Sequence, residues 1–181
     1  MMVQLSDRIN QMEESATIAM SKKAREMKES GIDVISLSLG EPDFNTPDFI
    51  KEAAKDGIDQ NYTKYMPVPG YLDLREAISH KFKRDNNLDY APNQIVVSTG
   101  AKQSIANVVL ALVNPGDEVI IPAPYWVSYI EIVRLAGGIP VIVETDLEDD
   151  FKLDAEGLAN SITAKSKLMI FSKSESESNH F

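Results

Sequence analysis

The sequence predicts an α/β protein in which a mainly parallel sheet is flanked by helices. From residue 95 onward, short apolar segments alternate with helical patterns. The expected strands lie near 95–98, 118–122, 139–144 and 167–171, and the expected helices near 101–112, 126–136 and 154–162. The strand segments are apolar on both faces, which is typical of a parallel sheet covered by helices. Asn114-Pro115-Gly116-Asp117 and Gly137-Gly138 supply the helix stops.

The first ninety residues contain three further helical patterns. One spans residues 15–30, with Ser15 or Thr17 as its cap and Gly31 as its C-terminal stop. Residues 32–39 alternate as a strand does. Thr46-Pro47 opens a second helix in the order cap, then proline, and a third begins near Tyr71 after a loop at 62–70.

Composition excludes several classes of function. The chain has 181 residues, of which 43% are hydrophobic, so it can fill one ordinary domain. A net charge of -10 argues against nucleic acid or an anionic membrane as a partner. The absence of cysteine and of a signal pattern favours a cytoplasmic protein. His80 and His180 are too few for a histidine-rich site, and we expect no metal.

The most informative segment joins an apolar strand to an amphipathic helix through Ser98-Thr99-Gly100-Ala101-Lys102-Gln103. A helix that starts at Gly100 or Ala101 points unpaired N–H groups and its positive dipole end at a place where phosphate can bind. Many strand-turn-helix units bind nothing. The turn lacks both Gly-x-Gly-x-x-Gly and Gly-x-x-x-x-Gly-Lys-[Ser/Thr], so a nucleotide-binding module is the weaker alternative.

Five motifs in order carry a family resemblance that extends from about Leu5 to Ser172. They are Gly40-Glu41-Pro42-Asp43-Phe44, Lys64-Tyr65 followed by Gly70, Ser98-Thr99-Gly100-Ala101-Lys102-Gln103, Asn114-Pro115-Gly116-Asp117-Glu118 and Pro124-Tyr125-Trp126. The set resembles the class I aminotransferases of fold type I, which depend on pyridoxal 5'-phosphate (PLP). Ser15-Ala16-Thr17 and Lys102 resemble the aspartate aminotransferase branch.

The resemblance assigns cofactor contacts to five residues. Gly100, Ala101 and Lys102 would bind the PLP phosphate through backbone N–H groups, in agreement with the helix-start argument. Trp126 would stack on the pyridine ring, whereas on its helix position alone it reads as a core aromatic. Tyr65 would cross a homodimer interface and hydrogen-bond the phosphate in the partner subunit. Without the family it is a tyrosine in a proline-rich loop.

The resemblance also implies the substrates. Gly40 would let its backbone approach the α-carboxylate, although a plain turn glycine explains it equally. Thr17 and Lys102 would contact the distal carboxylate of aspartate or glutamate. A helix cap and a surface lysine are their alternatives. The implied reaction transfers an amino group between these acids and a 2-oxo acid, and an aromatic aminotransferase or a carbon-sulfur lyase is the rival within the fold type.

In domain terms, the resemblance implies an N-terminal arm with a small-domain segment (1–45), the first part of an incomplete PLP-binding large domain (46–172) and an unrelated polar tail (173–181). The lysine that forms the Schiff base lies beyond this chain, which therefore holds no catalytic residue and is expected to be inactive alone. A frameshift, a premature stop or an engineered truncation would explain the tail. In the family, strands that come later in sequence flank the strand matching 95–98, so we expect that segment to lack a neighbour here.

Overall fold

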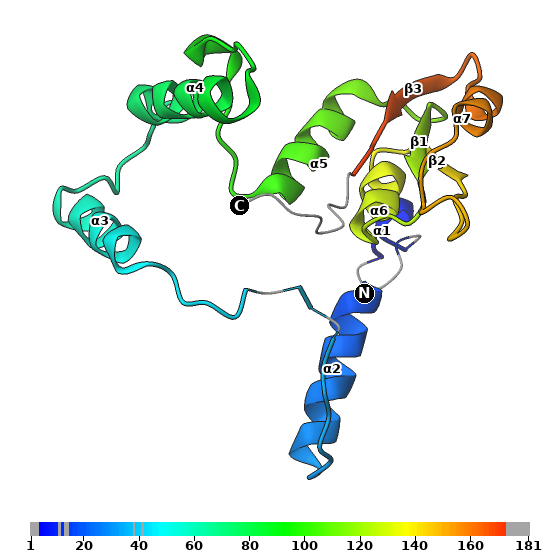
Figure 1. Ribbon diagram of the computed structural model, residues 1–181, viewed down its shortest axis with the longest axis horizontal. Coiled ribbons are helices and arrows are strands. Elements are labelled where there is room, and N and C mark those ends of the chain that lie inside the picture. Colours follow the sequence, from blue (N-terminus) through cyan, green and yellow to red (C-terminus); the bar gives the residue numbers. More distant parts are fainter. Residues whose placement is uncertain (1–3, 11, 13–14, 38, 41, 173–181) are drawn as a thin grey trace. The chain divides into compact units, whose positions relative to one another are not determined.

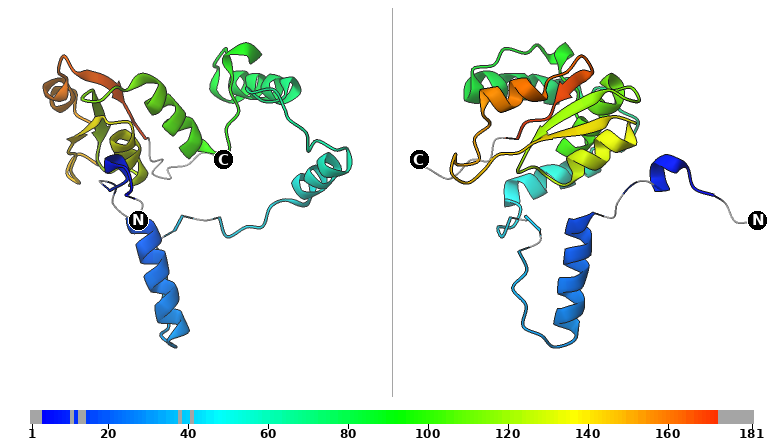
Figure 2. Two further views of the ribbon diagram at one scale, coloured as in Figure 1. Left: turned by 180° about the vertical axis from the view of Figure 1, so that it is seen from behind. Right: turned by 90° about the vertical axis from the view of Figure 1, so that its right-hand side faces the viewer.

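The structure is a computed structural model that describes residues 4–10, 12, 15–37, 39–40 and 42–172. The chain divides into two compact units, one formed by Met1–Leu39 with Lys102–Phe181 and the other by Gly40–Ala101. Figures 1 and 2 show their elements. These units are defined by contacts within the chain, and the domain boundaries expected near residues 45 and 172 stay predictions.

The sheet lies in the first unit and has three parallel strands (Figure 1). β1 (Glu118–Pro122) pairs with β2 (Ile139–Val143) on one side and with β3 (Ser166–Met169) on the other, which gives the order β2-β1-β3. Ile120 stands opposite Val141 in one pairing and opposite Met169 in the other. The sequence prediction of a parallel sheet built from these three segments is confirmed.

The core lies where two helices meet β1. α5 (Ala101–Leu112) contributes Val109 and α6 (Ser128–Leu135) contributes Val133, and both side chains are fully buried in one cluster with Val119 and Ile121 of the strand. Residues 119 and 121 share a face because side chains alternate along a strand. α7 (Ala155–Ser161) lies against β2, and the Asp154 carboxylate accepts a hydrogen bond from its first turn. All three helices fall where the sequence predicts them.

The N-terminal part of this unit holds a short helix, α1 (Asp7–Asn10), and a longer one, α2 (Ala16–Glu29). Gly31 ends α2 as predicted: its N–H donates to the carbonyl of Lys28, and the N–H of Ile32 donates to that of Met27. Residues 32–37 then run back along α2 (Figure 1) without forming a strand. The predicted strand at 32–39 is wrong in its described part, because no neighbouring strand supplies a hydrogen-bond ladder there.

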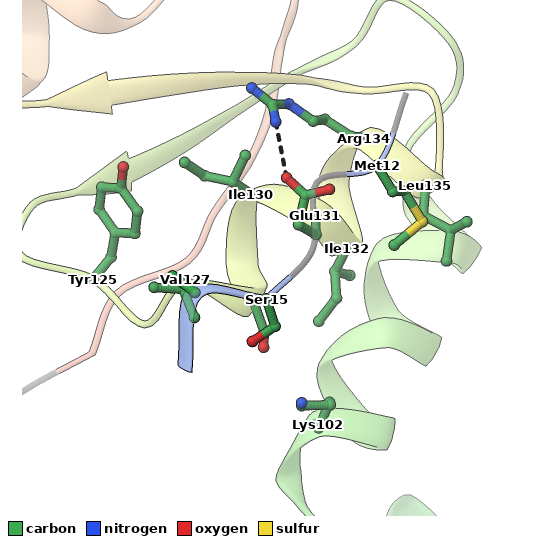
Figure 3. A pocket seen from close by; sticks show the side chains of 12 residues that line it. Met12, Ser15, Lys102, Tyr125, Val127, Ile130, Glu131, Ile132, Arg134 and Leu135 are labelled. Atoms are coloured by element: carbon green, nitrogen blue, oxygen red, sulfur yellow. Dashed lines mark hydrogen bonds and ion pairs between the residues drawn. The ribbon is translucent and has the colours of Figure 1, made fainter. Parts of the chain in front are cut away.

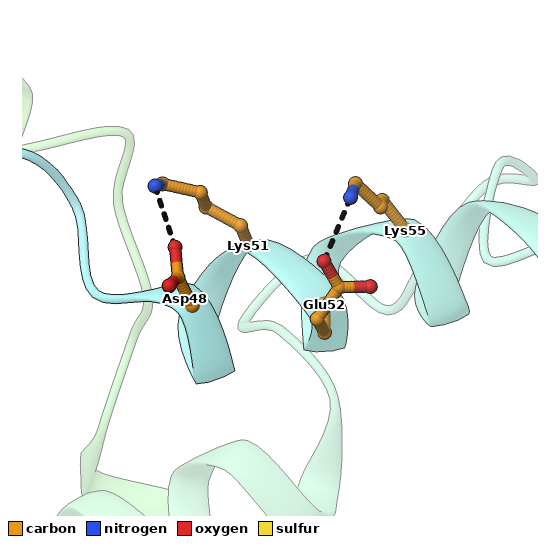
Figure 4. Close-up of polar contacts among 4 residues, drawn as sticks. All are labelled: Asp48, Lys51, Glu52 and Lys55. Atoms are coloured by element: carbon orange, nitrogen blue, oxygen red, sulfur yellow. Dashed lines mark hydrogen bonds and ion pairs between the residues drawn. The ribbon is translucent and has the colours of Figure 1, made fainter.

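The second unit holds α3 (Asp48–Asp59), α4 (Leu72–Asn86) and a 3-10 turn, η1 (Pro92–Gln94), that the sequence did not suggest. α3 begins one residue later than its signal predicts, since Pro47 rather than Thr46 occupies the N-cap. Two exposed ion pairs run along α3 at i,i+3 spacing (Figure 4), from Lys51 to Asp48 (2.9 Å) and from Lys55 to Glu52 (2.7 Å).

α4 is tied to its flanking loops by Arg75. Its guanidinium donates to the carbonyl oxygens of Gly70 (3.2 Å) and Pro92 (2.7 Å). These two hydrogen bonds connect the loop before α4 to the loop after it. Close packing also requires a glycine here: a Cβ on Gly70 would approach the Cγ2 of Val97 to 2.8 Å, and the φ of Gly70 is +95°. The loop that precedes α4 is therefore fixed against the segment that precedes α5.

Residues 95–98 form no strand, contrary to the element prediction. The N–H of Val97 instead donates to the carbonyl of Pro69 at 3.0 Å. The described sheet ends at β2 and β3, and neither pairs with this segment. The strand predicted at 95–98 is therefore wrong, and among the described residues no strand pairs with this segment.

Candidate functional site

The turn into α5 is built as the sequence predicts. Gly100 has a φ of +106°, a conformation that L side chains rarely adopt, and α5 begins at the next residue, Ala101. The first turn of α5 contains no acidic side chain. Its N–H groups and dipole therefore favour an anion at this end of the helix, with no neighbouring carboxylate on that turn to oppose it.

The loop after β1 presents Trp126 at the carboxyl end of the strand. Ala123 is held on both of its backbone groups: its N–H donates to the carbonyl of Val143 (2.9 Å), and its carbonyl accepts from the hydroxyl of Thr145. The N–H of Tyr129 then donates to the carbonyl of Trp126 at 3.0 Å. The loop is thus anchored at both ends, at the edge of the sheet where α/β proteins bind ligands.

Lys102 and Trp126 meet at this edge. The Nζ of Lys102 lies 4.6 Å from the centroid of the Trp126 ring, and the ring of Tyr129 lies edge-on to the indole at 5.6 Å and 88°. Trp126 is 40% exposed, so the alternative of a core aromatic does not hold. The start of α5 and the aromatic loop therefore form one surface.

A pocket of about 460 Å³ adjoins this surface (Figure 3). It is lined by Ser15 from the N-terminal segment, Lys102 from α5, Tyr125 from the loop and several side chains of α6. Glu131 and Arg134 form an ion pair of 2.8 Å along its wall. The lining combines the Lys102 ammonium, hydroxyl groups and this ion pair with apolar side chains, and a mainly apolar lining with a few polar groups is usual for a small-molecule site.

Thr17 does not share this pocket. It lines a second hollow, of about 570 Å³, between α2 and residues 34–37, and the hydroxyl of Ser21 donates to its carbonyl oxygen. Ser15 takes the place beside Lys102 instead. Ser15 is the N-cap of α2 but makes no side-chain capping bond, so its hydroxyl is available to the pocket. The sequence does contain this signal, since a second hydroxyl precedes Thr17 by two residues.

Gly40 and Tyr65 belong to the other unit, and their assigned contacts stay predictions. A Cβ on Gly40 would meet no atom within 4 Å, so local packing does not explain this glycine. Tyr65 is fully exposed, which leaves its hydroxyl accessible to another molecule.

Within the described residues, no three acidic or histidine side chains come together as metal ligands do. Among the helices that the structure describes, none is both long and apolar enough to span a bilayer.

The fold and the site define a class: an α/β protein that can hold a small anionic ligand between a helix start and an aromatic ring at the carboxyl end of a parallel sheet. A model of the family "aminotransferase class I and II" matches residues 32–175, and the chain belongs to this family.

Curated relatives support this assignment. The chain is 52% identical over 166 residues to an aspartate aminotransferase of Bacillus sp. (strain YM-2) and 54% identical over 167 residues to a probable aspartate/prephenate aminotransferase of Rhizobium leguminosarum bv. phaseoli. Each alignment covers 92% of this chain and 42% of the relative. The chain therefore spans about two fifths of the length of these relatives.

Solved structures agree. The aspartate aminotransferase of Thermus thermophilus with maleate matches with a TM-score of 0.89 and 46% identity, over 93% of this chain and 44% of the other. The alanine aminotransferase of Pyrococcus furiosus matches with a TM-score of 0.86 and 32% identity, over 92% and 43%.

Proposed function

We propose that the protein to which this sequence belongs transfers an amino group between aspartate or glutamate and a 2-oxo acid, with PLP as its cofactor. The observation that carries the proposal is the meeting of Lys102 with Trp126 at the start of α5, in a chain of the aminotransferase family. The names of its relatives support aspartate as a substrate.

The residues present fit PLP. The phosphate, an anion, suits the first turn of α5, where Gly100, Ala101 and Lys102 offer backbone N–H groups and no carboxylate opposes it. The pyridine ring, which is flat and apolar on its faces, suits the half-exposed indole of Trp126. When bound, PLP serves as an electron sink for the pair released when the substrate Cα loses its proton.

The chain's own side chains orient the substrate. The Lys102 ammonium binds the distal carboxylate by charge, and a hydroxyl assists it. Ser15 is the better placed hydroxyl because it lines the same pocket, whereas Thr17 lines another. Gly40 offers its backbone to the α-carboxylate. We expect the 181-residue chain alone to be inactive, because none of its residues matches the lysine that binds PLP covalently in the family.

The exposed hydroxyl of Tyr65 supports a homodimer in which Tyr65 reaches the phosphate of the partner subunit. The cysteine-free composition supports a cytoplasmic location.

The proposal is tested by Lys102→Ala in the complete enzyme, assayed with aspartate and with phenylalanine. Loss of a charged hydrogen bond costs roughly 1.5 to 3 kcal/mol, so kcat/KM for aspartate should fall by about one to two decades. Phenylalanine has no second carboxylate, and its kcat/KM should change little.

Lys165→Ala is the matched control, because Lys165 precedes the amino end of the sheet and is exposed. An equal loss with both substrates would contradict the role of Lys102 and favour an aromatic aminotransferase or a carbon-sulfur lyase.

A further inference from the structure

The indole of Trp126 has one fixed neighbour and one movable neighbour. Tyr129 is fixed, since it belongs to the buried cluster with Val109, Val133 and Ile132 and meets the indole at right angles. Lys102 is movable, since it is an exposed side chain on the first turn of α5. The indole is 40% exposed, and both side chains contact its ring.

The contact of Lys102 with the indole has the geometry of a cation-π interaction. An ammonium within about 6 Å of a ring centroid is attracted by the negative face of the ring, and the observed distance is 4.6 Å. Tyr129 offers a complementary edge-to-face contact, which is a preferred arrangement of aromatic pairs. The two contacts together favour a single plane for the indole.

We propose that Lys102 is a positioning residue for Trp126: its ammonium holds the indole in the plane set by Tyr129, and it does so before any ligand is present. The contact itself does not depend on the proposed function. Its use does, because a fixed indole plane would prepare the surface on which the cofactor ring stacks. It adds a second task to the Lys102 side chain, because a distal carboxylate would then draw the ammonium away from the indole.

The 181-residue chain contains one tryptophan, so fluorescence excited at wavelengths that tyrosine does not absorb reports on the surroundings of Trp126. Iodide and caesium quench an exposed indole with opposite dependence on nearby charge. A unit charge about 5 Å away in water enriches iodide and depletes caesium by roughly twofold each at moderate salt. Lys102→Met should therefore lower the ratio of iodide to caesium quenching constants roughly two- to fourfold, and Lys102→Arg should preserve it.

Lys165→Met is the matched control, because it removes the same charge near the opposite end of β1, where the carbonyl of Lys165 accepts from the N–H of Glu118. It should leave the ratio unchanged. In concentrated urea all variants should give the same ratio, because the contact requires the fold.

Orientation needs its own readout, which is the near-ultraviolet circular dichroism of the tryptophan. The band should weaken in Lys102→Met and return in Lys102→Arg, while Tyr129→Phe, which keeps the ring, should preserve it. An unchanged quenching ratio in Lys102→Met, or an equal change in Lys165→Met, would overturn the proposal. If Lys102→Met changes the quenching ratio but leaves the circular dichroism band unchanged, the Lys102 charge lies near the indole without orienting it. That result would also overturn the proposal. No cofactor or substrate is used, so the result is independent of the substrate assay with Lys102→Ala.

Discussion

Lys102 is the lysine that the structure places beside the aromatic loop, and its ammonium faces an indole. We predict that no lysine of the 181-residue chain forms a stoichiometric covalent bond with PLP. Phosphate-directed association can remain, because helix N-terminal interactions contribute only about 0.3 to 2 kcal/mol each. The purified chain is mixed with PLP and reduced with borohydride, and labelled lysines are mapped by mass spectrometry. Stoichiometric label at one lysine, with turnover of aspartate, would show that the chain is active alone.

At the residue scale, the sequence indicates which types of side chain the site contains better than it indicates which pocket each side chain lines. Gly100 follows from the pattern of a helix start, whereas the substrate contact of Lys102 comes from the family resemblance. Trp126 could not be separated from a core aromatic by spacing alone, since its exposure depends on how the loop is anchored at Ala123. The family resemblance assigns the substrate contact to Thr17, whereas the structure places Ser15 in the pocket with Lys102 and Thr17 in another pocket. Two nearby hydroxyls on one segment face different pockets, and spacing alone does not separate them.

At the element scale, α4 ends in a charged cluster with a measurable pKa. Asp85 accepts hydrogen bonds from Arg84 and, secondarily, from Lys81, and these lower the pKa of its carboxyl from 3.8 to about 2. A depressed pKa means that the contribution to folding stability is present above pH 4 and is lost as the pH falls toward 2. The contribution is small, because the group is exposed and screened by salt.

Carbon-detected NMR titration of the Asp85 carboxyl should therefore give a midpoint near 2, and Arg84→Ala should move it up toward 3.8. Arg84 is the test variant because its hydrogen bond is the largest cause of the shift. Added salt should move the midpoint in the same direction. A wild-type midpoint at 3.8 would mean that the cluster does not form in solution.

The predicted bounds of the helices lie within about two residues of the observed ones, whereas the strands predicted at 32–39 and 95–98 are not formed in their described parts. α5 and β1 agree at both ends because local spacing and burial point to the same answer. Residues 32–37 and 95–98 have strand-like sequences, but a strand exists only when a neighbour pairs with it. Whether such a neighbour exists depends on the topology of the whole sheet and cannot be predicted from the segment's own sequence.

At the scale of the whole molecule, we predict that the chain alone is not stably folded throughout. β2 and β3 are both outer strands of the described sheet, and such edges invite aggregation. Residues 95–98 pair with no described strand. In native-state hydrogen exchange of the soluble chain, the amides of β1 should be the most protected and those of residues 95–97 among the least. Strong protection at 95–97 together with a cooperative melt would instead show a stable fold of the isolated chain.

The strand order also has a consequence for synthesis on the ribosome. β1 occupies the centre of the sheet, yet one of its partners is made last: Glu118 pairs with Ser166, which is 48 residues later (166 minus 118). At translation rates of about 5–20 residues per second, this delay lasts roughly 2 to 10 s. During that interval the nascent chain carries the apolar residues Val119, Ile120 and Ile121 in a strand with at least one edge unpaired. A chaperone that binds extended apolar segments should therefore contact the nascent chain at β1 until β3 has emerged.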